Sequence, residues 1–202
     1  MLGRRNGLHP SALNPETQTQ IPETPGDVKN LTSAVVKKVK VGGIRLSREL
    51  VQVDVAGQSA DEVPGASLLL GLAEQKINLA CVTASLTQTP VVVSFCVAAD
   101  DFDAVQRMID GKPDLRQQIR ITSPVCCLTV FPHRWDLSLL GRLLSCLSTA
   151  GCPIYGVASS ISTLSFNTNY WSIGRALAAL ESMLELPLNH SPYKQEFLIR
   201  QI

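Results

Sequence analysis

The chain has 202 residues, of which 45% are hydrophobic and 17% are charged, and its formal net charge is +1. A chain with this balance can bury a hydrophobic core, so global disorder is excluded. The near-neutral charge provides no overall attraction to nucleic acids or anionic membranes, and we therefore expect neither as a partner.

Residues 1–38 have the composition of a flexible leader. Four prolines are spread through this segment, and its apolar residues follow no regular period. Such a segment cannot bury enough apolar surface to order itself. Arg4 and Arg5 are not followed by the apolar run of a secretory signal, so we expect a cytoplasmic protein.

Neither a membrane span nor a metal site is expected. The long uncharged stretch at 77–99 is interrupted by the turn residues 87–90, which divide it into two short apolar runs. The six cysteines form no Cys-x-x-Cys pair, and the chain has only three histidines. Buried, reduced thiols are therefore expected in place of a disulfide framework, and no cofactor is implied.

Residues 50–110 predict a first repeat of strands and helices. Apolar residues alternate with period two up to Gly57, which indicates a half-buried strand, and Gly65 opens a short amphipathic stretch. Acidic residues at 100–103 are typical of a helix start, and Gly111 ends that helix. The expected elements are a strand at 50–56, a helix at 65–76, strands at 77–86 and 91–99, and a helix at 100–110.

The same order then recurs, which predicts a second repeat. The expected elements are a strand at 125–132, a helix at 136–150, strands at 154–160 and 163–168, a helix at 171–184 and a late strand at 193–200. We therefore expect an α+β fold of two ferredoxin-like βαββαβ units, each with an antiparallel sheet packed against helices. The predicted divisions are the leader 1–38, a first domain at 39–122 and a second at 123–202.

Short motifs support this division. The first repeat contains Val63-Pro64-Gly65 at the helix start and Ile77-Asn78 at the following strand, and the second contains Ala150-Gly151 and Gly156-Val157-Ala158-Ser159-Ser160. Over residues 40–186 the chain resembles paired ACT domains, specifically the regulatory C-terminal region of aspartate kinase. The residues before position 40 could not hold a nucleotide-binding domain, so we expect no phosphoryl transfer and no other enzymatic activity.

The resemblance implies a site for an amino-acid effector where the loop after the first strand faces another domain. Amide N–H groups at a helix N-terminus suit its carboxylate, and a carboxylate with an amide oxygen suits its ammonium. The candidate ligand-binding residues are Gln58, Asp61, Glu62, Val63, Gly65, Ala66 and Asn78.

These residues also have structural interpretations. Asp61 and Glu62 are equally suited to capping the next helix, Asn78 to holding a turn, and Gly65 to turning the backbone. In the second repeat, residues 133–136 read His-Arg-Trp-Asp with no Pro-Gly. We expect this second site to be degenerate.

Two functions follow as hypotheses. The preferred one is a non-catalytic regulatory module that binds an amino acid and acts through a homodimer or a partner enzyme of amino-acid metabolism. The alternative is an assembly module that binds no ligand. Dimerisation is expected because apolar strands such as 91–99 would be unfavourable at an open sheet edge.

Overall fold

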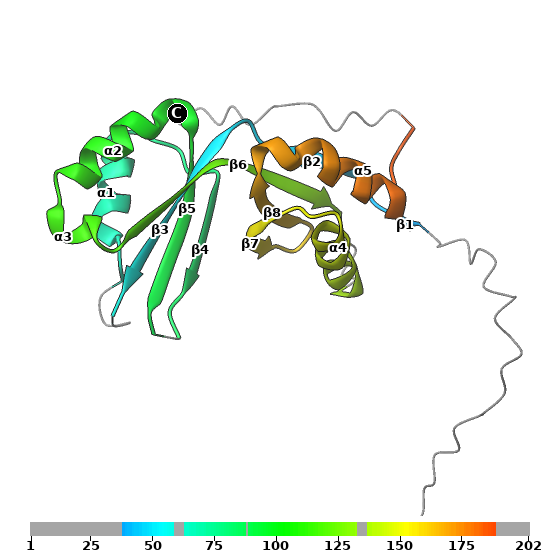
Figure 1. Ribbon diagram of the computed structural model, residues 1–202, viewed down its shortest axis with the longest axis horizontal. Coiled ribbons are helices and arrows are strands. Elements are labelled where there is room, and N and C mark those ends of the chain that lie inside the picture. The colour runs from blue at the N-terminus through cyan, green and yellow to red at the C-terminus, as the bar shows by residue number, and fades with distance from the viewer. Residues whose placement is uncertain (1–37, 59–62, 88, 133–136, 189–202) are drawn as a thin grey trace, which may run out of the picture. The chain divides into compact units, whose positions relative to one another are not determined.

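The computed structural model describes residues 38–58, 63–87, 89–132 and 137–188 (Figure 1). The expected leader, apart from Lys38, lies outside the described residues. So do Asp61 and Glu62, the loop at 133–136 and the expected strand at 193–200.

The first repeat follows the strand and helix order that the sequence predicts. It comprises β3 (Leu50–Gly57), α1 (Ala66–Glu74), β4 (Cys81–Ser85), β5 (Val91–Ala98) and α2 (Phe102–Asp110). β5 pairs antiparallel with both β3 and β4. Alternate residues of β3 point to the helices, so Val53 and Val55 are fully buried in one cluster with Leu68 of α1 and Ile109 of α2.

Two expectations about this repeat are wrong. The strand predicted at 77–86 begins only at Cys81, because residues 76 and 77 close the C-terminus of α1. Lys76 has a φ of 57°, its N–H bonds Ala73 O, and the N–H of Ile77 bonds Leu72 O, which together form a Schellman cap. In addition, β5 is not an edge strand, since it lies between β4 and β3.

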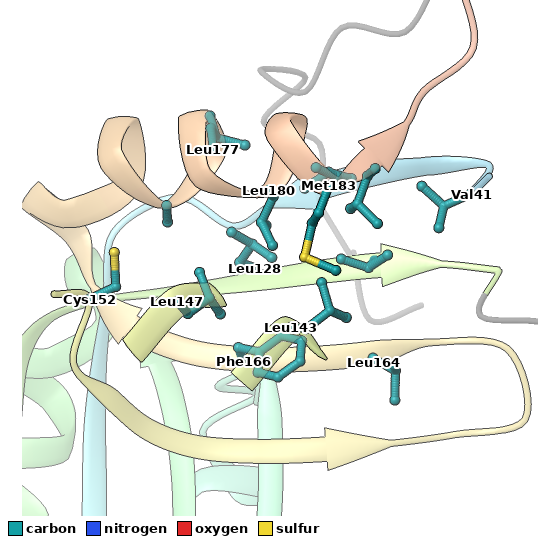
Figure 2. Close-up of a cluster of buried hydrophobic side chains, with 14 of the residues drawn as sticks. Val41, Leu128, Leu143, Leu147, Cys152, Leu164, Phe166, Leu177, Leu180 and Met183 are labelled. Atoms are coloured by element: carbon teal, nitrogen blue, oxygen red, sulfur yellow. The ribbon is translucent and has the colours of Figure 1, made fainter. Parts of the chain in front are cut away.

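The second repeat has a core of its own. It comprises α4 (Leu137–Thr149), β7 (Ile154–Ser159), β8 (Leu164–Asn169) and α5 (Ile173–Met183). Figure 2 shows Leu143 and Leu147 of α4 facing Phe166 of β8, with Leu180 of α5 in the same cluster; all four are fully buried. The leucines at helical spacing in the predicted helices therefore form this core.

One long strand, β6 (Ile119–Phe131), belongs to both repeats (Figure 1). Its first half pairs antiparallel with β3, and its second half pairs antiparallel with β8. The strand predicted at 125–132 is therefore six residues too short at its start. Its first residues are half-buried or exposed, so they lack the continuous apolar run that marks the second half.

Strand β2 (Gly43–Leu46) completes the second sheet by pairing antiparallel with the end of β6. The strand orders are β4-β5-β3-β6 in the first repeat and β7-β8-β6-β2 in the second. Both are the ferredoxin-like order, so the predicted α+β fold class is confirmed.

The segment before β3 packs with the second repeat, whereas the predicted first domain, 39–122, includes it. β1 (Val39–Lys40) pairs in parallel with β9 (Leu184–Glu185). Val41, Ile44 and Leu46 are buried in the core of the second repeat, in one cluster with Leu180 and Met183 of α5. On this side of β6 the first half is already paired with β3, so β2 can pair only with the second half. The domain boundaries themselves stay predictions.

Short helices connect the longer elements: η1 (Ala99–Asp101), α3 (Pro113–Arg116) and η2 (Tyr170–Ser172). Among the helices in the described residues, none is both long enough and apolar enough to cross a membrane.

Candidate functional site

A cavity of about 950 Å³ opens at the N-terminus of α1. The loop after β3 forms one wall, and the connection from α2 through α3 to β6 forms the other, because the ferredoxin-like order places these two connections at the same end of the sheet. The lining residues are Gly57, Gln58, Val63, Pro64, Gly65, Ala66, Ser67, Gly111, Lys112, Pro113, Asp114, Leu115 and Gln118.

Gly65 sets the direction in which α1 leaves this cavity. Its φ is +76°, and a Cβ at this position would lie 3.1 Å from Cγ2 of Val55. Its carbonyl accepts the N–H groups of Leu68 and Leu69 at 2.9 Å, which starts the helix. Glycine is therefore required both by the left-handed backbone and by the contact with β3. The turn of the backbone therefore explains the glycine at position 65 without a ligand.

The cavity carries groups of both charges. No described side chain caps α1, and its first turn holds no acid, so the partial positive charge of the helix N-terminus faces the cavity. Lys112 is half-buried and donates a hydrogen bond of 3.0 Å from Nζ to Oγ of Ser67 in the first turn. The exposed carboxylate of Asp114 lies on the same wall. This arrangement can accept a carboxylate and an ammonium together.

The structure brings together four of the seven candidate residues. Gln58, Val63, Gly65 and Ala66 line this cavity, whereas Asp61 and Glu62 lie outside the described residues. Lys112 and Asp114 were not predicted, because Gly111 and Pro113 beside them indicate only the end of a helix. Only the tertiary fold brings this connection to the N-terminus of α1.

Asn78 lies elsewhere, beyond the C-terminus of α1, where it lines a second cavity of about 530 Å³. At a rise of 1.5 Å per residue, the nine residues of α1 separate its two ends by roughly 13 Å. An amino acid bound next to Gly65 therefore cannot touch Asn78 of the same copy.

The hydroxyl groups near the β7–β8 turn hold that turn. Oγ of Ser160 lies 2.7 Å from Oγ1 of Thr163 and accepts the N–H of Thr163 at 3.1 Å. The loop at 133–136, on which the predicted degeneracy of the second site rests, lies outside the described residues.

The cysteines are free and poorly suited to nucleophilic chemistry. Burial raises the pKa of Cys127 to about 11, and burial together with the nearby Cys81 and Cys127 raises the pKa of Cys96. Both therefore stay protonated near neutral pH. Within the described residues, no three His, Cys, Asp or Glu side chains form a metal-binding group.

No protein-family model and no curated protein matches this sequence. Solved structures do match. The regulatory subunit of aspartate kinase from Thermus flavus has a TM-score of 0.61 at 18% identity, and the match covers 72% of this chain and 99% of that one. The ligand-free regulatory subunit from Thermus thermophilus has a TM-score of 0.60 at 18% identity, with coverages of 72% and 99%.

The whole aspartate kinase from Clostridium acetobutylicum matches with a TM-score of 0.59 at 12% identity, over 75% of this chain and 37% of that one. At these identities the likeness shows the fold. The chain thus has the ACT-type fold of aspartate kinase regulatory domains, and the resemblance inferred from the motifs is confirmed.

Proposed function

We propose that this chain is a non-catalytic regulatory module that binds an amino-acid effector and transmits binding through a second copy or a partner enzyme. The observation that carries the proposal is the cavity at the N-terminus of α1, which combines Lys112 and Asp114 with a helix N-terminus that no described side chain caps. An amino acid carries one charge of each sign, so this pattern suits it.

Within this cavity, the effector carboxylate lies against the first turn of α1 and Lys112. Charge-assisted hydrogen bonds of this kind are the stronger ones in proteins. The effector ammonium lies toward Asp114 and the amide oxygen of Gln58. The effector side chain then rests against Val63, Pro64 and Leu115, which supply the apolar part of the lining.

A twofold arrangement of two copies would give Asn78 a part in the site. If the α1 helices of two copies lie side by side and antiparallel, the end that carries Asn78 in one copy meets the Gly65 end of the other. The separation of Asn78 and Gly65 within one copy therefore supports a homodimer in which two copies share each site.

The class of effector has support from a protein of the same fold. Aspartokinase III of E. coli has been solved in complex with lysine and aspartate in the T-state. We infer that the present chain responds to an amino acid in the cytoplasm and acts on an enzyme of amino-acid metabolism.

A thermal-shift screen against the twenty common amino acids, followed by calorimetric titration of any hit, tests the proposal. We expect a saturable rise in melting temperature with at least one amino acid. Lys112→Ala and Asp114→Ala should each weaken binding about tenfold or more, since each removes a charge-assisted contact. Lys40→Ala and Asp103→Ala are matched controls outside the cavity, and they should bind normally.

Mixing two inactive variants tests whether the site is shared between copies. Asn78→Ala and Lys112→Ala should each bind weakly alone. In a mixed dimer, one site would contain both wild-type residues, so about half of the sites formed by mixed dimers should bind normally. If each site lay within one copy, mixing the two variants would restore no binding.

A ligand-free assembly module is the second candidate function. It is favoured by the absence of Pro-Gly from the loop at 133–136 and by the structural role that already explains Gly65. If no amino acid changes the melting temperature of the full chain, this second function replaces the first.

A further inference from the structure

The second cavity, of about 530 Å³, lies between the two repeats and shares no lining residue with the cavity at α1 of the same copy. Its first-repeat wall comes from the starts of β3 and β4 and the end of β5. Its second-repeat wall comes from β2, β6, β7 and β8. The volume lies within the range of sites for small molecules.

One row of residues runs straight across the four strands of the second-repeat wall. Arg45 of β2 is opposite Thr129 of β6, Thr129 is opposite Ser165 of β8, and Ser165 is opposite Ala158 of β7. All four line the cavity. Residues opposite each other in neighbouring strands share one face of the sheet, so this row presents a guanidinium, two hydroxyls and a methyl group side by side.

Two arginines dominate the charge of the cavity. The guanidinium of Arg45 lies over the ring of Phe131, with Cζ 4.4 Å from the ring centre, and this contact holds its position. Arg48 contacts Asp100 at 3.2 Å in an exposed ion pair, which a ligand can replace at little cost. Asp101 is the one acid among the described lining residues, and Asp100 pairs with Arg48 from outside the lining.

The opposite wall carries apolar side chains beside Asn78 and Asp101. Leu50 is buried, and it lines the cavity together with Leu79 and Ala98 of the first repeat. The hydroxyls of Thr129 and Ser165 lie 2.8 Å apart, so they already form one hydrogen bond and keep further capacity as acceptors and donors. The cavity therefore has a cationic, hydroxyl-bearing side and an apolar side.

We propose that this cavity binds a small amphipathic organic acid. Its carboxylate or phosphate group lies between Arg45 and Arg48, and its apolar body lies against Leu50, Leu79 and Ala98. Planar guanidinium groups match the oxygen geometry of a carboxylate and of a phosphate. A neutral ligand would not form the same charge-assisted hydrogen bonds with the arginines. A ligand in this position touches both repeats and stabilises their contact.

The test uses the full chain with phenylacetate, phenyl phosphate, inorganic phosphate and the neutral 2-phenylacetamide as probes. We expect saturable calorimetric binding and a rise in melting temperature with phenylacetate or phenyl phosphate, and the stronger of the two identifies the acid group. The neutral amide should have no effect. Equal binding of the amide and the acids, or no binding of either acid, would overturn the proposal.

Substitutions of the two arginines test whether the acid binds in this cavity. Arg45→Gln and Arg48→Gln should each raise the Kd of the acid about tenfold or more. Arg120→Gln is the matched control, because Arg120 is an exposed arginine paired with Asp54 outside both cavities, and it should bind normally. An unchanged Kd in the Arg45→Gln/Arg48→Gln double variant contradicts the proposal.

Amide chemical shifts of the wild-type chain provide a readout that does not depend on variant folding. Addition of the acid should shift the amides of Leu79, Ala98 and Thr129. Shifts confined to Ser67 and Lys112 would place the acid in the cavity at α1 and reject this second site. Amino-acid binding at α1 can fail without affecting this result, so the two proposals are tested separately.

Discussion

Asn167 of β8 donates a hydrogen bond from Nδ2 to Oε1 of Gln52 in β3, at 3.1 Å, and this contact joins the two repeats. Both side chains are buried, at 6% and 2% exposure. Nδ2 of Asn167 also lies 3.3 Å from Sγ of Cys96, and Nε2 of Gln52 donates to Asp54 Oδ1 at 2.9 Å. The parts of the sheet that belong to the two repeats therefore meet through a buried polar cluster.

Loss of one partner of this contact should be costly. Asn167→Ala leaves the buried Oε1 of Gln52 with only the weak thiol donor of Cys96, at 3.9 Å, so we expect a loss of about 1–3 kcal/mol in the free energy of unfolding. Urea denaturation measures it. In a double-mutant cycle, Gln52→Ala should cost clearly less in the Asn167→Ala background than in the wild type. Additive costs would show that the two side chains do not act together.

Two glycine substitutions should change stability in opposite directions. Gly65→Ala places a Cβ 3.1 Å from Val55 at a φ of +76°, so it should destabilise the protein by about 1–2 kcal/mol. Gly141→Ala lies in α4, where a Cβ meets nothing within 4 Å. It should stabilise by about 0.5–1 kcal/mol, because alanine loses less backbone entropy in a helix. Thermal denaturation compares the two, and a neutral Gly65→Ala would contradict this account of the turn.

Two deletions should separate the leader from the segment that packs with the second repeat. Removal of residues 1–37 should leave the unfolding free energy nearly unchanged, because that composition cannot form a core. Removal of residues 1–46 also deletes β2 with the buried Ile44 and Leu46, and it should unfold the second repeat. Circular dichroism and proteolysis would detect the difference.

A point substitution tests the same packing within the full chain. Ile44→Ala removes a side chain that is 1% exposed, and it should cost about 2–5 kcal/mol. Arg45→Ala, at the next and exposed position, is the control for general disturbance of β2 and should cost much less. Equal costs would indicate that β2 does not hold the second core.

Dimerisation should depend on β4 and β7, the outer strands of the sheet that β6 joins across both repeats. β4 and β7 end the strand order, and they expose Val82 and Val157 at 50% and 37%. Unpaired apolar edges favour pairing with a second chain. Light scattering at micromolar concentration should show a dimer for the wild type and a monomer for Val82→Lys with Val157→Lys. If the wild type is a monomer, the proposed function does not involve a homodimer.

Stability should fall at alkaline pH because of the buried thiols. The pKa of Cys127 is raised by burial from 9.0 to about 11. Unfolded thiols therefore ionise first as the pH rises, and the folded state loses stability between about pH 9 and pH 11. Urea midpoints measured across this range should decrease, and Cys127→Ala should reduce the slope. A constant midpoint would show that the folded and unfolded thiols titrate alike.

The local elements and the fold class could be predicted from the order of the amino acids. Alternating valines in β3 and leucines at helical spacing in α4 and α5 reflect the period of the local backbone, which requires no knowledge of distant contacts. The two occurrences of the strand-helix-strand-strand-helix order were sufficient to predict ferredoxin-like units. Motifs such as Pro64-Gly65 also placed four of the candidate residues at one helix N-terminus.

The contacts between distant segments could not be predicted in this way. β6 is shared by both repeats, β2 pairs with the second one, and Lys112 lies beside Ser67, because sheet pairing joins residues that are far apart in the chain. The length of α1 separates Asn78 from Gly65, although both belong to motifs of the same repeat. A candidate site defined by nearby motifs was therefore divided in space, since a helix between two motifs places them at opposite ends.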